Sequence, residues 1–275
     1  MLRSLNSAVS GMQQFQEEMD VIGNNIANVN TTGFKSASTD FAEAFDQQLS
    51  GGVGGQPIQI GTGVTTDAIS TSFVQGSISP TGSSTDVAIS GGGFFVVKDT
   101  VTGAESVTRD GSFHLDSNGY LLTSGGLRVQ GYTNPSPSTT MGDIKIDNTG
   151  APNSSTADLQ SFNIGSDGTV SVTLTDGTNY SRGQLLLQNF SNPGALIKEG
   201  ANLYSFNSTA GPLAAPAAGG SAGVGEMVSG ALELSNVDLA GQFADLITAQ
   251  RAFQANARVI TTSDEVLQEL VNLKH

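Results

Sequence analysis

Two histidines are the residues best suited to nucleophilic or acid–base chemistry in this 275-residue chain. A serine nucleophile needs a histidine close by to accept its proton. His275 is the last residue, where disorder is the default expectation, and His114 lies in a strand-like stretch, so we expect it to face outward. The carboxylate pairs Glu17-Glu18 and Asp264-Glu265 lie on helical patterns, where we expect solvated faces or contacts between subunits. We therefore predict no catalytic residues.

Two loops could in principle hold a phosphate or a cation. The glycine run 91–93 could cradle a phosphate, but it lacks the GxGxxG spacing, and a strand pattern at 94–97 follows it instead of a helix. The stretch 116–119 resembles the start of a calcium loop, but the closing Glu is missing. We therefore expect tight turns at both places and predict no cofactor and no metal site.

Composition excludes several classes of function. The net charge is −14, and the 11 Lys and Arg residues form no basic stripe, which argues against a nucleic-acid partner. The absence of Cys excludes disulfides, thiolate nucleophiles and Cys-ligated metals. No apolar run approaches the roughly 20 residues of a membrane helix, and the first residues do not resemble a secretory signal peptide. Only 13% of the residues are charged, which suits a secreted or polymeric protein.

Both ends of the chain carry apolar residues in a seven-residue repeat, which predicts long helices with seams that need a partner. The N-terminal rows are Leu5, Met12, Met19 and Ile26, and Ala8, Phe15, Ile22 and Val29. The C-terminal rows are Leu239, Leu246, Phe253, Ile260 and Leu267, and Phe243, Gln250, Ala257, Asp264 and Val271. We expect the first helix to end near 28–33 and the second to begin after Ser235-Asn236, which provides N-cap chemistry. The two helices could simply pack on each other within one molecule, or they could require neighbouring copies.

The middle of the chain has the pattern of antiparallel strands. Short β-branched and apolar segments alternate with Asp-Gly and Asn-Gly pairs, which favour tight hairpin turns. We expect a short helix at 41–49, Gly-rich connectors at 50–55 and 211–225, and an exposed loop at 134–140.

Several stretches resemble the bacterial flagellar axial family of rod and hook proteins. They are MDVIGNNIANVNTTGFK at 19–35, DVAISGGGFF at 86–95, TRDGSF at 108–113, SNVDL at 235–239, AQRAFQANA at 249–257 and TSDEVL at 262–267. Because the matches lie at both ends and in the centre, the resemblance spans most of the chain.

The resemblance implies an α+β fold, with terminal α-helices in a coiled-coil core domain and central antiparallel all-β domains. The domains predicted in this way are a helical core at 1–34 and 232–275, a connector at 35–72, a β-rich outer domain at 73–132 and 162–231, and a small insertion at 133–161.

The resemblance also implies which residues act in assembly. The predicted polymerisation interface is Leu5, Met12, Phe15, Met19, Ile22, Ile26, Leu239, Phe243, Leu246, Phe253, Ile260 and Leu267. The family motif residues are Asn24, Asn25, Asn28, Gly33, Phe34, Gln250 and Arg251. These residues predict a helical homopolymer that contacts other axial proteins (rod, hook cap and hook–filament junction) and the flagellar type III export apparatus, with no cleavable signal peptide.

Within the family, the stretches at both ends look closest to the hook, the extracellular joint that transmits torque while it bends. The distal rod, which spans the periplasm, is the alternative, because 133–161 leaves no room for the large outer domain of many hook proteins. We expect a hook subunit and keep the distal rod as second choice. A secreted carbohydrate-binding or adhesive β protein and a secreted hydrolase are more distant alternatives, since neither accounts for seams at both termini.

Overall fold

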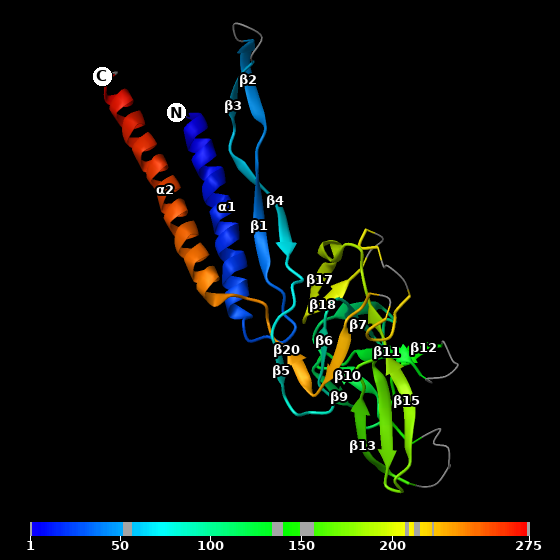
Figure 1. Ribbon diagram of the computed structural model, residues 1–275. Coiled ribbons are helices and arrows are strands. Elements are labelled where there is room, and N and C mark those ends of the chain that lie inside the picture. The colour runs from blue at the N-terminus through cyan, green and yellow to red at the C-terminus, as the bar shows by residue number, and fades with distance from the viewer. Residues whose placement is uncertain are drawn as a thin grey trace. The chain divides into compact units, whose positions relative to one another are not determined.

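The protein consists of two compact units (Figure 1), which we call the helical unit and the sheet unit. The helical unit comprises Met1–Val29, Ser36–Ser72 and Val237–His275, and the sheet unit comprises Asn30–Lys35 and Phe73–Asn236. The computed structural model describes residues 2–51, 57–133, 140–148, 157–206, 209–211, 215–221 and 223–273.

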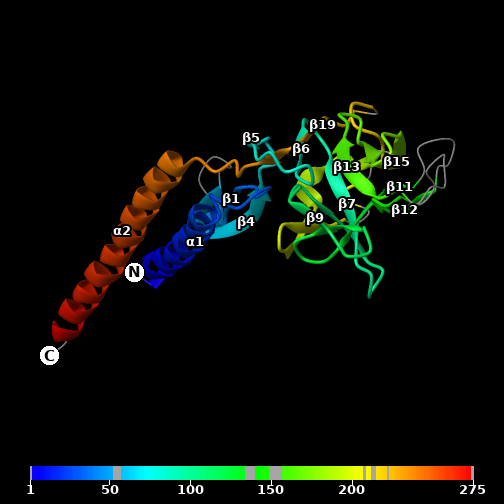
Figure 2. The same cartoon turned by 90° about the horizontal axis from the view of Figure 1, so that it is seen from below.

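Two long helices dominate the helical unit, as the seven-residue repeats predict. They are α1 (Leu2–Ala27) and α2 (Leu239–Asn272), and they lie side by side in opposite directions (Figures 1 and 2). The side chain of Asp238 caps α2 by accepting a hydrogen bond from the Ala240 amide at 3.1 Å. After α1 ends, the Asn28 side chain donates to the carbonyl of Asn24 at 2.9 Å.

Small side chains allow α1 and α2 to approach closely. Ala8, Gly11 and Ala249 are buried. A Cβ atom on Gly11 would lie 2.6 Å from the side-chain nitrogen of Asn256. A larger residue at position 11 would therefore have to displace the side-chain amide of Asn256.

A long two-stranded ribbon packs on α1 in the same unit. Its strands are β1 (Ala37–Glu43), β2 (Asp46–Gly51), β3 (Pro57–Gly61) and β4 (Val64–Thr71), with β1 paired to β4 and β2 to β3. Phe15 of α1 meets Phe41 of β1 edge to face, with ring centroids 6.0 Å apart.

The ribbon corrects two expectations for this part of the chain. The predicted helix at 41–49 is wrong, because these residues form the ladders of β1 and β2, whose backbone groups pair across the ribbon. In the segment 35–72, which we expected to be a connector, the described residues 36–51 and 57–72 belong to the helical unit and include the four strands of the ribbon. Of the Gly-rich stretch 50–55, residues 52–55 lie outside the described residues.

The sheet unit is built from short antiparallel strands, as the turn dipeptides predict. They are β5 (Ile78–Pro80), β6 (Val87–Ser90), β7 (Phe94–Lys98), β8 (Glu105–Thr108), β9 (Phe113–Leu115), β10 (Leu121–Thr123), β11 (Arg128–Tyr132), β12 (Met141–Asp143), β13 (Leu159–Ile164), β14 (Thr169–Leu174), β15 (Asn179–Leu185), β16 (Leu187–Gln188), β17 (Ile197–Gly200), β18 (Leu203–Ser205), β19 (Glu226–Ser229) and β20 (Ala231–Glu233), with a 3-10 turn at Pro193–Ala195. The main sheet runs in the order β13-β14-β15-β11-β7-β8-β18-β17, while β19 pairs with β6 and β20 with β5.

Strand β7 separates two hydrophobic cores, because successive side chains of a strand point to opposite faces. Phe95 and Val97 belong to the larger core, and Phe94 and Val96 belong to the smaller one, which also contains Tyr204. The apolar run of this strand therefore reflects burial on both faces.

Two segments that we expected to be a small insertion within the β domain and a flexible link contribute to the sheet unit and its core. The described part of 133–161 contributes β12, β13 and the buried Ile144 and Ile146 to the main sheet and its core. In the predicted linker 211–225, Ala217 exchanges two backbone hydrogen bonds with Leu187, and Val224 is buried. Backbone hydrogen bonds therefore hold described residues of this low-complexity stretch against the sheet. Most of the predicted loop 134–140 lies outside the described residues.

The turns that we considered as ligand loops serve the fold. Gly91 and Gly93 have φ of +117° and +121°, and a Cβ atom on Gly91 would lie 2.9 Å from the Cα of Gly225. Residues 116–119 form a tight turn with Gly119 at φ +81°, and His114 is exposed on β9, as predicted. Over the described part of the chain, no cluster of His, Cys, Asp or Glu could hold a metal, and neither helix is long and apolar enough to cross a membrane.

Candidate assembly surface and a buried charge cluster

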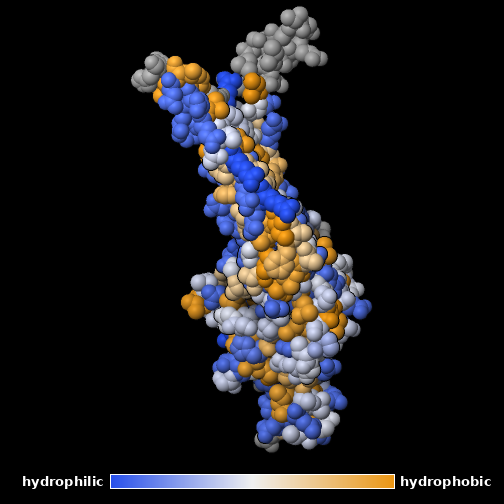
Figure 3. Space-filling view, turned by 90° about the vertical axis from the view of Figure 1, so that its left-hand side faces the viewer, coloured by the Kyte–Doolittle hydropathy of each residue, from blue (hydrophilic) through white to orange (hydrophobic). Residues whose placement is uncertain are grey.

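Helix α2 presents apolar side chains on surfaces that α1 does not cover. Leu239, Phe243 and Ile247 follow one another at four-residue spacing and are 39%, 50% and 49% exposed. Since residues four apart lie on one face of a helix, they form a stripe, which Arg251 continues. Figure 3 shows the outer face of α2 as a mixture of hydrophobic and hydrophilic surface.

A second group of exposed apolar residues lies nearer the C-terminal end of α2. Its members, 40% to 80% exposed, are Val259, Val266, Leu270, Val271 and Leu273. Exposed apolar area of this kind on one helix is typical of a surface that binds a partner. We refer to both groups together as the α2 apolar surface.

The structure divides the predicted interface residues into covered and uncovered sets. Ile22 is buried, and Leu239 and Phe243 are exposed. The half-buried members are Leu5, Met12, Phe15, Met19, Ile26, Leu246, Phe253, Ile260 and Leu267. The first C-terminal row is therefore largely half-buried. The second C-terminal row lies on an uncovered flank of α2, because it includes the exposed residues Phe243, Gln250, Asp264 and Val271.

Among the motif residues, Asn25 has a clear local role. It is 1% exposed, and its amide nitrogen donates to the Ala37 carbonyl and to the Gln242 side chain, both at 2.8 Å. Its side-chain oxygen accepts from the Ala37 amide at 3.0 Å. One amide therefore connects α1, the ribbon and α2. Asn24, Gln250 and Arg251 are exposed, and Asn28 is half-buried.

The segment that follows α1 is held within the sheet unit. Gly33 has φ +67°, and a Cβ atom there would lie 2.6 Å from the Asp110 amide nitrogen, so only glycine fits. Phe34 is buried, and the Lys198 ammonium lies 5.3 Å from the centre of its ring. The Thr32 carbonyl accepts from the Asn202 side chain at 2.8 Å.

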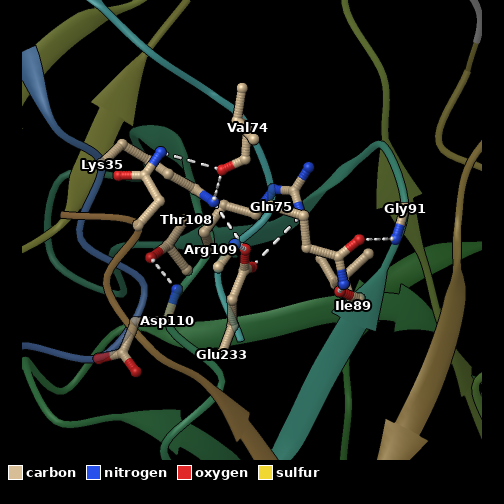
Figure 4. Close-up of polar contacts among 11 residues, drawn as sticks. Lys35, Val74, Gln75, Ile89, Gly91, Thr108, Arg109, Asp110 and Glu233 are labelled. Atoms are coloured by element: carbon tan, nitrogen blue, oxygen red, sulfur yellow. Dashed lines mark hydrogen bonds and ion pairs between the residues drawn. The ribbon is translucent and has the colours of Figure 1, made fainter. Parts of the chain in front are cut away.

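A cluster of three buried charges lies at the end of this segment (Figure 4). Lys35 and Glu233 have fully buried side chains, with Lys35 Nζ 2.6 Å from Glu233 Oε1. Arg109 is 4% exposed, and its guanidinium lies 3.4 Å from Glu233 Oε2 and 5.1 Å from the centre of the Phe94 ring. We call these three residues the charge cluster.

Burial dominates the electrostatics of the charge cluster. It lowers the pKa of Lys35 below its usual value, although the bond and the charge of Glu233 act in the opposite direction. Burial likewise lowers the pKa of Arg109, again opposed by Glu233. The single carboxylate is shared by two cations, and the buried Nε of Arg109 has no hydrogen-bond partner. Such a group orients and ties chain segments; it offers no nucleophile.

Sequence reasoning named Gly33 and Phe34 as family motif residues and missed the charge cluster. Lys35 and Arg109 lie inside the quoted motifs, but nothing in their spacing shows that they are buried together. Glu233 is 198 positions from Lys35. The one available signal is that charged residues occur within otherwise apolar or turn-forming motifs.

Three family models match the chain. They are the flagellar basal body rod FlgEFG protein C-terminal model at residues 228–273, the flagellar hook protein FlgE/F/G D1 domain at 88–172, and the flagella basal body rod protein model at 5–35. Together they cover α1, much of the main sheet and α2.

Relatives extend the match to the whole chain. The flagellar basal-body rod protein FlgG of Bacillus subtilis is 43% identical over 281 positions, covering all of both chains. FlgG of Buchnera aphidicola subsp. Schizaphis graminum is 38% identical, covering 99% of this chain and all of the relative. The flagellar hook protein FlgE of Borreliella burgdorferi is 26% identical over 445 positions, covering all of both chains. A solved structure, Helicobacter pylori flagellar hook protein FlgE2, aligns over 49% of this chain and 36% of that chain at 14% identity with a TM-score of 0.24, too low to compare the folds.

Terminal helices around an antiparallel β region, matched by rod and hook models, define a flagellar axial protein. The chain belongs to the flagellar rod and hook family FlgE/F/G, whose members are structural components of the flagellum and not enzymes.

Proposed function

We propose that this protein is the distal rod subunit of the flagellar basal body and polymerises into a hollow helical tube that transmits motor torque. The observation that carries the proposal is the full-length match to proteins named FlgG, at 43% and 38% identity with alignments close to the length of this chain. Agreement over both helices and the whole β region supports a shared place in the flagellum.

The comparisons favour the rod over the hook. From the sequence motifs we had expected a hook subunit. The hook relative is only 26% identical, and its alignment extends to 445 positions because it carries residues that this chain lacks. The motifs at 19–35 and 249–257 misled us, because stretches that rods and hooks share cannot separate the two. The chain length, which pointed to the rod, is the better discriminator.

The helices supply a physical reason for assembly. Water contacts Phe243, Ile247 and the other members of the α2 apolar surface in a single chain, and covering this area would stabilise an assembly by about 25 cal/mol per Å² buried. A second copy carries the same surface and can cover it in a repeating helical arrangement. The proposed core of the tube is a coiled coil of α1 and α2 helices from neighbouring copies, with the predicted interface residues at its contacts.

Export and location follow from this proposal. The subunit passes unfolded through the flagellar type III apparatus and is incorporated next to other axial proteins of the rod and hook. Completing the helix contacts only at the assembly site delays the ordering cost of the termini until neighbours are present.

Labelling of isolated flagellar bases tests the rod against the hook. The chain has no Cys, so a single introduced thiol is unique. Val101→Cys is suitable because Val101 is 89% exposed in the turn between β7 and β8, and Thr175→Cys provides a second exposed position after β14. Hook–basal bodies purified from cells that carry either variant are treated with biotin-maleimide and streptavidin-gold and examined by electron microscopy.

Gold on the straight rod is the expected result. Gold on the curved hook would assign the chain to the hook instead. Gold on neither structure, with the protein present in the cells and reactive when denatured, would contradict both axial assignments. The unmodified Cys-free chain is the matched control and should carry no gold.

A further inference from the structure

The chain passes between the two units at four points, and these belong to three segments of the sheet unit. Asn30–Lys35 enters from α1 and leaves to β1, Phe73 begins the segment that follows β4, and Asn236 ends the segment that precedes α2. A force transmitted along the chain between the units must pass through these three segments.

One ammonium group joins all three segments inside the sheet unit (Figure 4). Lys35 Nζ, at the end of the first segment, donates to the carbonyl of Val74 in the second segment at 2.9 Å. It also donates to Glu233 Oε1, at the start of the third segment, at 2.6 Å. Few single groups in the described residues connect three parts of the chain so distant in sequence.

Glu233 extends this connection. Its Oε1 also accepts from the Gly76 amide of the second segment at 2.9 Å, and its backbone carbonyl accepts from the Gly33 amide of the first at 2.8 Å. Gln75 then anchors the second segment to the end of β6, donating to the Ile89 carbonyl at 3.2 Å and accepting from the Gly91 amide at 2.9 Å.

A buried ion pair differs physically from an apolar contact in the same place. Its net contribution to stability is small, because the cost of removing charges from water offsets their attraction, but it tolerates little displacement. An apolar contact can slide by an ångström at little cost, whereas a buried cation that moves away from its acceptors loses several charge-assisted hydrogen bonds together.

We propose that Lys35 and Glu233 form a buried staple, which keeps the three connecting segments in register so that torque applied to one unit is transmitted to the other with little displacement of these segments. This inference rests on the proposed function, because it assigns a mechanical role within a rod. Lys35 acts here as a positioning residue, through Val74 and Glu233.

Lys35→Met in the full-length chain tests the staple. The substitution removes the ammonium and keeps an apolar stem of similar length, and it leaves Glu233 paired with Arg109, one anion with one cation. Lys98→Met is the matched control, because it removes a Lys from an exposed pair with Glu105 in the same unit. Amide hydrogen exchange of the full chain is measured for both variants and for the unchanged protein.

The staple predicts a local effect. Exchange should accelerate about tenfold or more at the amides of Gly33, Gly76 and Leu234, and stay unchanged at those of β7 and β14. Uniform acceleration across the sheet unit would mean that Lys35 contributes only to global stability, and no acceleration would mean that the segments hold without it. Either result overturns the proposal. If Lys35→Met does not fold, Lys35→Gln, which also removes the ammonium but keeps a polar donor, takes its place; the same local acceleration is expected, and uniform or absent acceleration would overturn the proposal as well.

Swimming of cells that carry Lys35→Met tests whether the staple helps to transmit torque. Flagella should assemble in normal number, and speed should fall at least twofold relative to Lys98→Met in viscous medium. Equal speeds at equal flagellar number would overturn the staple while leaving the rod assignment intact. The rod assignment itself fails only if the gold label is absent from the rod, so the two failures are distinguishable.

Discussion

At the scale of single residues, a few side chains with unusual surroundings determine how the chain is held. Gly33 has a left-handed backbone against Asp110, and Asn25 uses its whole amide to connect three elements. The charge cluster is the most demanding of these sites, because a single buried carboxylate is the shared partner of two buried cations. A change at Glu233 should therefore cost far more than a change in an exposed ion pair.

Glu233→Gln leaves Lys35 and Arg109 buried without an anion. We expect the free energy of unfolding to fall by about 3–5 kcal/mol, measured by denaturant titration of the full chain. Glu105→Gln breaks the exposed pair with Lys98, whose side chains are 42% and 45% exposed, and should cost less than about 1 kcal/mol. Similar small losses for both variants would show that the buried cations find other compensation.

At the scale of elements, the α1–α2 pair combines close packing with an unfavourable charge contact. Glu18 of α1 is partly buried, and burial together with the charge of Asp245 on α2 raises its pKa above the usual value. An acid whose pKa is raised on folding destabilises the folded state at pH values above that raised pKa. The penalty disappears as the pH falls below 4.5, the ordinary value, because the carboxyl is then protonated in both states.

Glu18→Gln should therefore raise the melting temperature at pH 7 and change it little at pH 4. Thermal unfolding of the full chain, followed by helical circular dichroism at both pH values, measures the difference. Asp20→Asn removes a negative charge from the exposed side of the same helix and should have a small effect at both. A gain for Glu18→Gln that is equal at pH 4 and pH 7 would refute the electrostatic explanation.

The elements also show where reading the sequence succeeded. Seven-residue periodicity predicted both terminal helices, because apolar side chains at that spacing share one helix face whatever the helix packs against. Turn dipeptides predicted the antiparallel strands for a similar local reason. The helix expected at 41–49 was wrong, because pairing with β3 and β4 overrides local propensity. The linker at 211–225 was misread because backbone pairing, such as that of Ala217 with Leu187, requires no distinctive side chains.

At the scale of the whole molecule, the question is how one chain joins the next. Leu246 and Ile260 lie half-buried on α2, so a charge at either position would disturb the folding of the helix pair as well as assembly. Phe243 is 50% exposed and separates the two effects.

Phe243→Asp should leave the thermal unfolding of the isolated chain nearly unchanged and abolish polymerisation, because a charge on the α2 apolar surface would have to be buried against a neighbour. Sedimentation of purified protein and counts of flagella per cell measure the two effects. Gln254→Asp introduces the same charge at an exposed polar position of α2 and should still polymerise. Normal flagella in cells that carry Phe243→Asp would show that the stripe of Leu239, Phe243 and Ile247 takes no part in assembly.

By itself, the sequence determined the terminal helices, the antiparallel β region, the lack of a catalytic constellation and the axial family, since all of these depend on residue types and short spacings. Only the tertiary structure decided which faces of α2 remain uncovered, that the described residues 37–51 and 57–71 form a ribbon on α1, and that Lys35, Arg109 and Glu233 share one buried site. The physical reason is sequence distance. Periodicity reports which side of an element is apolar, whereas the partner of a buried charge 198 positions away depends on how all the elements between them pack.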